Sequence, residues 1–197
     1  LFRSAPMTPR ALFFTDEVYV TFVPGTRSLE VAAMDPMQGP VFFDVSQDPK
    51  ADKPYKQETD RCLRCHDTYS MTGGGVPRFM LSSVITGPTG DLVSHELSEI
   101  TEQSTPIAQR FGGWYVTGQS GKQIHLGNFI VKDVNELKQR PWTGKINQDD
   151  LKDFVDLAAY PRATSDIVAQ LVLQHQVEVQ NRLVRLRSEE HTSELQS

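Results

Sequence analysis

The sequence predicts an α+β protein, in which a small β-rich lobe over residues 1–50 precedes a mainly helical domain over residues 51–186. Two observations favour this fold class. Apolar and polar residues alternate over Glu17–Val23 and the alternation ends at Pro24-Gly25, which is typical of a short strand followed by a turn. Farther along the chain, apolar residues recur at steps of three and four positions between residues 168 and 186, which predicts a long helix.

The N-terminal lobe contains two further stretches with the character of strands. Ser28–Ala33 and Pro40–Val45 follow the first strand, and Asp35-Pro36 and Gly39-Pro40 interrupt the chain between them. Short strands separated by turn residues favour a β-meander. Residues 46–54 are polar and include two prolines, so we interpret them as a linker to the second domain.

The second domain contains four segments that favour helices. Lys56–His66 is expected to form a helix or half-helix, and Val134–Arg140 and Gln148–Leu157 are expected to form short helices. Thr164 or Ser165 can cap the last helix. The apolar stripe of this helix is made of Val168, Leu171, Val172, His175, Val179, Leu183 and Leu186. The stripe is expected to face the core, which would bury His175.

The strongest chemical signal is Cys62-Leu63-Arg64-Cys65-His66, which has the form C-x-x-C-H of a c-type haem attachment sequence. Two thiols three positions apart lie on nearly the same side of one helical turn, so both sulfurs can form thioether bonds with the two vinyl groups of one porphyrin. His66 follows directly, and its imidazole can bind the iron as the proximal ligand. The sequence therefore predicts one covalently attached haem c.

Three other interpretations of the two cysteines compete with haem attachment. A redox-active C-x-x-C pair usually lies in a βαβ context, which this segment lacks. A structural zinc site would need two more nitrogen or sulfur ligands, and the sequence has no second pair of cysteines. A disulfide between Cys62 and Cys65 would close a very small loop and would stabilise little.

The ligand on the other side of the iron would decide the chemistry, because an occupied position supports electron transfer and an open one admits peroxide or small gases. His125, on the polar face of the strand-like stretch 123–126, and His175, in the last helix, are candidate metal ligands beside His66. Met80 is a further candidate. Met71 is poorly placed, because five residues of chain span at most about 17 Å. The sequence leaves the choice open, including that of no ligand.

Haem also carries two anionic propionates, for which arginine is the favoured partner. Arg78 and Arg110 flank apolar stretches near the motif and are the candidates for this role. Trp114 and Tyr115 can pack on the ring while their N–H and O–H groups reach a propionate. The predicted cofactor-binding set therefore joins Arg78, Arg110 and Trp114 to the three residues of the attachment motif.

The motif makes the chain resemble a c-type cytochrome. A second stretch, Arg110–Gly118 together with Ile124-His125-Leu126-Gly127-Asn128, is similar to one in a little-characterised group of bacterial haem-c proteins. The resemblance runs from about Asp16 to Leu186, and its only highly specific part is the C-x-x-C-H motif. It implies a cytochrome c-like fold for the haem domain, electron transfer with redox partner proteins, and maturation on the periplasmic side of a bacterial membrane.

Two functions are therefore carried forward. The first is a c-type cytochrome domain that transfers electrons through one haem. In this interpretation the protein is an electron carrier and not a catalyst acting by itself. The alternative is a module of a peroxidase-like haem oxidoreductase, whose iron has an open or displaceable sixth position. A haem-linked binding or sensing module is a third possibility, supported only by the presence of the N-terminal lobe.

Composition and the chain ends add weaker constraints. The net charge of −5 gives no reason to propose nucleic-acid binding, and no apolar run has the length needed to span a bilayer. Leu1 is not a start residue, so the lack of a signal peptide carries no information about location. Residues 187–197 look like the translation of a sequencing adapter, and we exclude them, with His191, from the native protein. We expect the chain to be a fragment.

Overall fold

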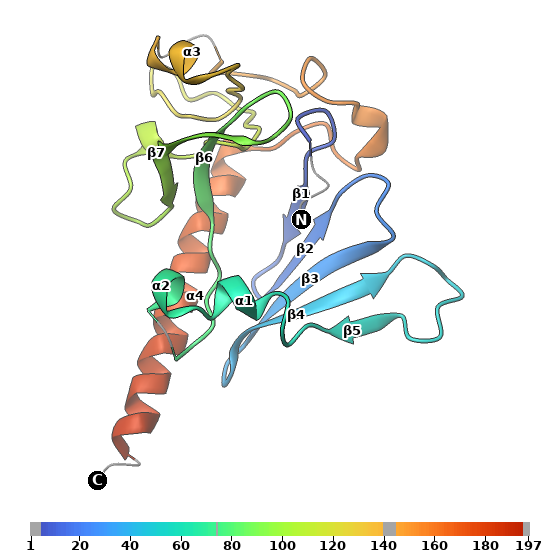
Figure 1. Cartoon of the computed structure of the whole chain (residues 1–197), viewed down its shortest axis with the longest axis vertical. Helices are drawn as coiled ribbons and strands as arrows, with labels where there is room; N and C mark the ends of the chain where they lie inside the picture. Colours follow the sequence, from blue (N-terminus) through green and yellow to red (C-terminus); the bar gives the residue numbers. More distant parts are fainter. Residues whose placement is uncertain (1–4, 74, 140–144, 195–197) are drawn as a thin grey trace. The chain divides into compact units, whose positions relative to one another are not determined.

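The computed structural model describes residues 5–73, 75–139 and 145–194 (Figure 1). The chain divides into two compact units, and each unit is built from two segments of sequence. The sheet unit consists of Ala11–Met80 and His175–Ser197, and the loop unit consists of Leu1–Arg10 and Leu81–Gln174. The strands of the predicted N-terminal lobe and the C-x-x-C-H motif therefore lie in the same unit.

The sheet unit contains a five-stranded antiparallel sheet whose strands are neighbours in the order of the sequence (Figure 1). Its strands are β1 (Ala11–Phe14), β2 (Val18–Phe22), β3 (Ser28–Asp35), β4 (Gly39–Ser46) and β5 (Tyr55–Gln57). The strands predicted near residues 17–23, 28–33 and 40–45 are confirmed by β2, β3 and β4. Aromatic and β-branched residues suit these positions, because such side chains pack well on a half-buried pleated surface.

The turn between β3 and β4 follows directly from its residues. The Asp35 carboxylate accepts hydrogen bonds from the backbone N–H groups of Met37 and Gln38, at 2.7 and 2.8 Å. Gly39 then takes a positive φ of 80°, which is free of strain only for glycine. These two hydrogen bonds also lower the pKa of Asp35.

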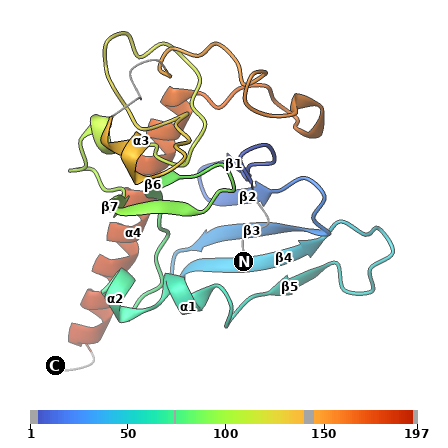
Figure 2. The same cartoon turned by 45° about the horizontal axis from the view of Figure 1, so that its top comes forward.

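The helices of the sheet unit are two single turns and part of one long helix. The short helices α1 (Leu63–His66) and α2 (Tyr69–Thr72) follow β5, and α4 (Ile167–Glu194) contributes its residues from His175 onward. Figures 1 and 2 both show α2 beside α4, and a Cβ atom added at Gly73 would lie 3.0 Å from Nη1 of Arg185. The buried apolar side chains of this unit are Tyr19, Val23, Phe42, Phe79, Val177 and Val184.

The loop unit contains one two-stranded antiparallel sheet and many irregular segments. Its elements are β6 (Ser82–Thr86), β7 (Leu92–Ile100), the 3₁₀ helices η1 (Ile107–Gln109) and η3 (Leu157–Ala159), the helix α3 (Val134–Lys138) and the first residues of α4. Side chains replace much of the missing regular hydrogen bonding. The Asn128 side chain, for example, accepts from the N–H of Val116 and donates to its carbonyl oxygen, at 2.6 and 2.7 Å.

The expected mainly helical, cytochrome c-like domain over residues 51–186 is wrong. Among the described residues, antiparallel sheets occupy both units, and α1, α2 and α3 span only four, four and five residues. Of the helix or half-helix predicted over Lys56–His66, only the last four residues are helical, as α1, because residues 55–57 pair with β4 as an edge strand. The helix predicted over Gln148–Leu157 also fails, because Gln148 forms an antiparallel bridge with Gly118.

The helix predicted over Val134–Arg140 is present as α3 over Val134–Lys138. Arg140, the last residue of the helix predicted from Val134, lies outside the described residues, as do Pro141 and Gly144. The described helix α3 begins at Val134 because the Asp133 carboxylate accepts from the N–H groups of Asn135 and Glu136. The boundaries expected at residues 50 and 186 stay predictions, and α4 continues without a break to Glu194.

The long C-terminal helix is confirmed, but the prediction of its buried face is wrong. Val168, Val172, Leu183 and Leu186 of the predicted core stripe are 50–61% exposed, and His175 is also exposed. The buried residues of α4 are Ile167, Gln170, Leu173, Gln174, Val177, Glu178 and Val184. Polar side chains share this face because each has a partner: Gln170 donates to the carbonyl of Tyr115, Gln174 accepts from the Arg110 guanidinium, and Glu178 pairs with Arg182. Hydropathy patterns do not register such contacts.

We predict that Gly112→Ala destabilises the loop unit. A Cβ atom at this position would lie 2.7 Å from the carbonyl oxygen of Val84 and 2.9 Å from its nitrogen, so the backbone would have to move. Overpacking of this kind costs about 1–3 kcal/mol. The matched control is Gly87→Ala, whose Cβ would meet only the Val93 side chain within 3.4 Å. Urea unfolding of both variants measures the difference, and equal stabilities would contradict the packing described here.

Candidate functional site

The C-x-x-C-H motif forms one helical turn in the sheet unit. The backbone N–H groups of Cys65 and His66 both donate to the carbonyl oxygen of Cys62, at 3.2 and 3.1 Å. Cys62 is half-buried and Cys65 is exposed, and no disulfide joins them. The motif therefore presents two reduced thiols from a single turn, which is the local geometry that attachment to one porphyrin requires.

The environment of Cys62 favours a protonated thiol. Burial is the main cause that raises the pKa of Cys62, and the Arg61 guanidinium opposes the shift. Arg61 is itself held by Asp44, at 3.3 Å, and by Glu58, at 3.8 Å. The cysteines of redox-active C-x-x-C motifs have lowered pKa values, because catalysis needs a thiolate. The shift at Cys62 has the opposite direction.

The imidazole of His66 is held by a hydrogen bond to the backbone of Arg78. Its Nδ1 atom lies 2.8 Å from the carbonyl oxygen of Arg78, and the N–H of Arg78 donates to the carbonyl oxygen of His66 at 2.9 Å. A carbonyl oxygen can only accept, so we assign the ring proton to Nδ1. Nε2 is then left with a bare lone pair, and this is the form of histidine that binds a metal ion. Burial also lowers the pKa of His66, which favours the neutral ring.

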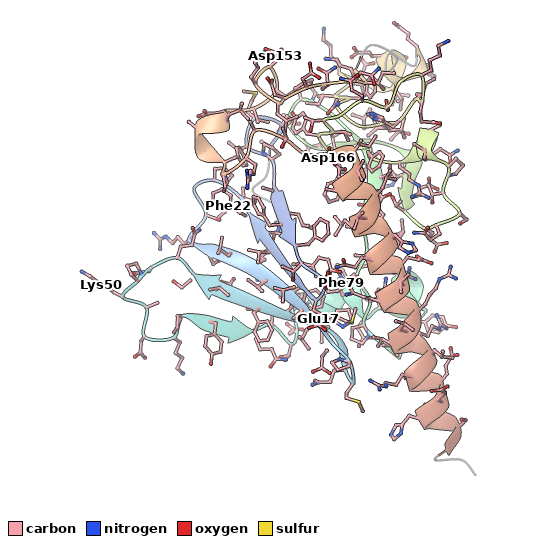
Figure 3. All side chains as sticks on the ribbon, turned by 180° about the vertical axis from the view of Figure 1, so that it is seen from behind. Glu17, Phe22, Lys50, Phe79, Asp153 and Asp166 are labelled. Atoms are coloured by element: carbon pink, nitrogen blue, oxygen red, sulfur yellow. The ribbon has the colours of Figure 1, made fainter. Side chains whose placement is uncertain are left out.

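Three aromatic side chains support this histidine. Phe42, from β4, packs its ring against the His66 imidazole with 4.5 Å between centroids. Phe79 meets Phe42 edge to face at 6.1 Å and lies 4.6 Å from the ring of Tyr19, from β2. Figure 3 shows Phe79 between the sheet and α4. Of these three rings only Phe42 contacts the imidazole, and its packing restricts rotation of the His66 ring.

The surface next to the motif carries uncovered apolar side chains. Tyr69 and Met71 on α2, which packs against α1, are 83% and 41% exposed. Met80 and Arg78 are half-buried in the same unit. A haem macrocycle is a large apolar plate that needs apolar contacts beside its ligands. The thiols, the free imidazole nitrogen and this surface together fit the group.

The donor atoms do not fit a metal ion held by protein ligands alone. Over residues 5–73, 75–139 and 145–194, no three His, Cys, Asp or Glu side chains come together as a set that could hold an ion. A structural zinc ion takes four protein ligands. The iron of a haem is bound by four porphyrin nitrogens, so the protein needs to supply only one or two further ligands.

His125 lies in the loop unit in a different state from His66. It is 1% exposed, and its Nδ1 atom accepts the backbone N–H of Gly127 at 3.1 Å. The proton of its neutral ring is therefore on Nε2, which leaves no free lone pair for a metal ion. Phe111 packs against the ring edge to face, and burial lowers the pKa of His125. In this arrangement His125 is a buried structural histidine.

His175 lies in the sheet unit on the exposed face of α4. The structure therefore contradicts the core position expected for it. An exposed imidazole is satisfied by water and has no need of iron as a partner, which removes the physical reason for its selection from the sequence.

The predicted propionate partners in the loop unit have polar groups that are already engaged. Arg110 is 8% exposed, and its guanidinium donates to the backbone carbonyls of Glu102, Gln103 and Thr105 and to the Gln174 side chain. The Trp114 indole N–H donates to the backbone carbonyl of Ser82 at 2.9 Å, and the Tyr115 hydroxyl donates to the backbone carbonyl of Pro6 at 2.8 Å. These side chains therefore stabilise loops of their own unit.

The residues that the sequence did not indicate are Phe42, Phe79 and the backbone of Arg78. A carbonyl acceptor belongs to every residue and leaves no signature in the sequence. In the sequence, the two phenylalanines were visible only as members of strand-like stretches. The contact of Phe42 with His66, and that of Phe79 with Phe42, depend on how β4 and the segment after the motif come together.

Comparison with known proteins adds no assignment: no protein-family model, curated protein or solved structure matches the chain. Among the described residues, no helix combines the length and the low polarity needed to cross a membrane.

We predict that the half-buried His66 and the buried His125 are opposite tautomers in the haem-free protein. Two-dimensional ¹⁵N–¹H correlation spectra of the imidazole rings should place the proton on Nδ1 of His66 and on Nε2 of His125, because one nitrogen donates to a carbonyl and the other accepts from an amide. A proton on Nε2 of His66 would contradict the ligand-ready state described above.

We also predict that the haem-free protein loses stability on acidification. The pKa of His66 is lowered from 6.5, so the unfolded chain binds its proton first as the pH falls. Its contribution to stability is complete above pH 6.5 and is lost as the pH falls toward the folded pKa. Urea midpoints at about pH 7.5 and about pH 5.5 should show a smaller drop in His66→Asn than in the unchanged chain. An equal drop in both proteins would contradict this assignment.

Proposed function

We propose that the chain is a haem-c domain that transfers electrons through one covalently attached haem. The observation that carries the proposal is the state of His66, whose Nδ1–H donates to the carbonyl of Arg78 while Nε2 keeps its lone pair. A metal-binding histidine is oriented by a hydrogen bond of this kind from its other nitrogen. The two free thiols on the same helical turn supply the covalent anchor.

Cys62 and Cys65 would hold the cofactor by addition chemistry. Each S–H would add across one vinyl C=C bond, with sulfur bonded to one carbon and hydrogen to the other. No electrons are gained or lost overall, so the attachment needs no oxidant. The raised pKa of Cys62 also argues against the competing role of a redox-active dithiol, for which a thiolate is required.

The other residues of the site would tune and protect the iron. When bound, haem supplies an iron that exchanges one electron between its ferric and ferrous states. The hydrogen bond from His66 to Arg78 makes the imidazole a stronger electron donor, which favours the ferric state. Phe42 would shield one side of the imidazole from water, and Phe79 packs against Phe42. The exposed Tyr69 and Met71 would give apolar contact to the macrocycle edge.

The setting of this activity belongs to the same proposal. Covalent haem attachment implies maturation on the periplasmic side of a bacterial membrane, and an electron carrier implies redox partner proteins. The mixed charges beside the motif support a transient encounter with a partner. Arg64 and Asp60 form an exposed ion pair there at 2.6 Å, and the exposed Lys56 pairs at 3.0 Å with Glu58, whose side chain is only 10% exposed. Pairs of this kind contribute little to stability and remain available to other charges.

The attachment is tested by production of the chain in a host that matures c-type haem. The purified protein should show a Soret band, and the colour should remain with the protein in acidified organic solvent. Cys62→Ser and Cys65→Ser together should leave haem that the solvent extracts, and His66→Ala should change the axial ligation. The proposal would be contradicted if haem in the double-serine variant resisted extraction. It would also be contradicted if the protein without substitutions showed no Soret band.

The role of carrier is tested by carbon monoxide. A carrier with two axial ligands should give a ferrous spectrum that does not change when carbon monoxide is added. Rapid binding would show an open or displaceable sixth position and would favour the peroxidase-like oxidoreductase instead. Met80→Leu extends the test, because this half-buried methionine lies in the same unit as the motif. If Met80 were the sixth ligand, its replacement would allow carbon monoxide to bind.

A further inference from the structure

The geometry points to Asn181, on α4, as the residue that positions the proximal histidine of the proposed haem site. This inference rests on the proposed haem attachment. Asn181 does not touch His66, and it acts through the backbone that supplies the hydrogen-bond acceptor of the imidazole.

The Asn181 side chain grips the backbone of Phe79 at both polar atoms. Its Oδ1 atom accepts the N–H of Phe79 at 2.9 Å, and its Nδ2 atom donates to the carbonyl oxygen of Phe79 at 2.8 Å. A side-chain amide that satisfies both backbone groups of one residue acts as a substitute for a neighbouring strand. These two hydrogen bonds connect residues that are 102 positions apart in the sequence, so they join α4 directly to the segment after the motif.

The peptide that precedes Phe79 carries the carbonyl of Arg78, which accepts the Nδ1–H of His66. The N–H of Phe79 and the carbonyl of Arg78 belong to the same planar peptide unit, so the bond from Asn181 fixes the orientation of that unit. The other side of Arg78 is fixed by its N–H bond to the carbonyl of His66. The acceptor for the imidazole is therefore held from two directions.

The consequence for the iron follows from the bond between the imidazole and this carbonyl. A well-aligned Nδ1–H···O bond raises the electron density on Nε2 and stabilises ferric iron. Loss of the Asn181 grip frees the peptide unit to rotate and weakens that bond. The ferric state then loses stabilisation, so the reduction potential rises.

The variant that tests this role is Asn181→Leu, which keeps the size of the side chain and removes both hydrogen bonds. In the haem-loaded protein, the ratio of ferric to ferrous iron at a fixed applied potential should fall by about threefold to tenfold, and tenfold corresponds to about 59 mV for one electron. The matched control is Gln180→Leu. Its side chain also makes two hydrogen bonds to the sheet unit, with Asp16 and Tyr19, but none near the Arg78 carbonyl.

The outcomes separate positioning from stability. The control should lower the thermal midpoint without a change in potential, whereas Asn181→Leu should change both. An unchanged potential in Asn181→Leu, or equal shifts in the two variants, would overturn the inference. Asn181→Ala replaces Asn181→Leu if the leucine variant does not fold. If neither Asn181 variant takes up haem while Gln180→Leu does, Asn181 has a role in folding alone and the inference is overturned. An unchanged chain without haem would instead overturn the proposed function.

Discussion

Two hydrogen bonds between His66 and Arg78 determine how the whole site is built. The backbone bond closes the segment between these residues, and the bond from the imidazole fixes the tautomer of the ring. The sheet contributes Phe42 against one side of the imidazole, and α4 contributes Asn181 behind the acceptor peptide. Segments far apart in sequence are therefore needed to present one nitrogen atom. The single turn that carries the two thiols requires only local hydrogen bonds.

Comparison of His66 with His125 shows why burial alone does not define a ligand. His125 is the more buried residue, and burial lowers the pKa of both rings. The difference lies in the group that faces Nδ1. A carbonyl oxygen draws the proton to Nδ1 of His66 and frees Nε2, whereas an amide N–H places the proton of His125 on Nε2. The same residue type therefore has its free lone pair on Nε2 in one place and uses its Nδ1 lone pair within a loop in the other.

The sequence predicted the parts of the protein that depend on local pattern. The strands β2, β3 and β4 follow from β-branched and aromatic residues with turn residues between them, and the turn of the motif follows from its spacing. The predicted mainly helical domain failed because β5 replaces the start of a helix by pairing with β4, a contact that local propensity does not encode. The face of α4 was also misassigned, because amides such as Asn181 bind backbone groups where hydropathy favours leucine and valine.

We propose that Cys62 and Cys65 hold a haem whose iron is bound by His66. Mass spectrometry of protein from a haem-maturing host, intact and after proteolysis, tests it most directly. We expect an intact mass greater than that of the chain by one haem, and the added mass should lie on the peptide that contains residues 62–66. An unmodified peptide with two free or disulfide-bonded cysteines, from a host that matures a control cytochrome, would rule out covalent haem attachment at residues 62–66.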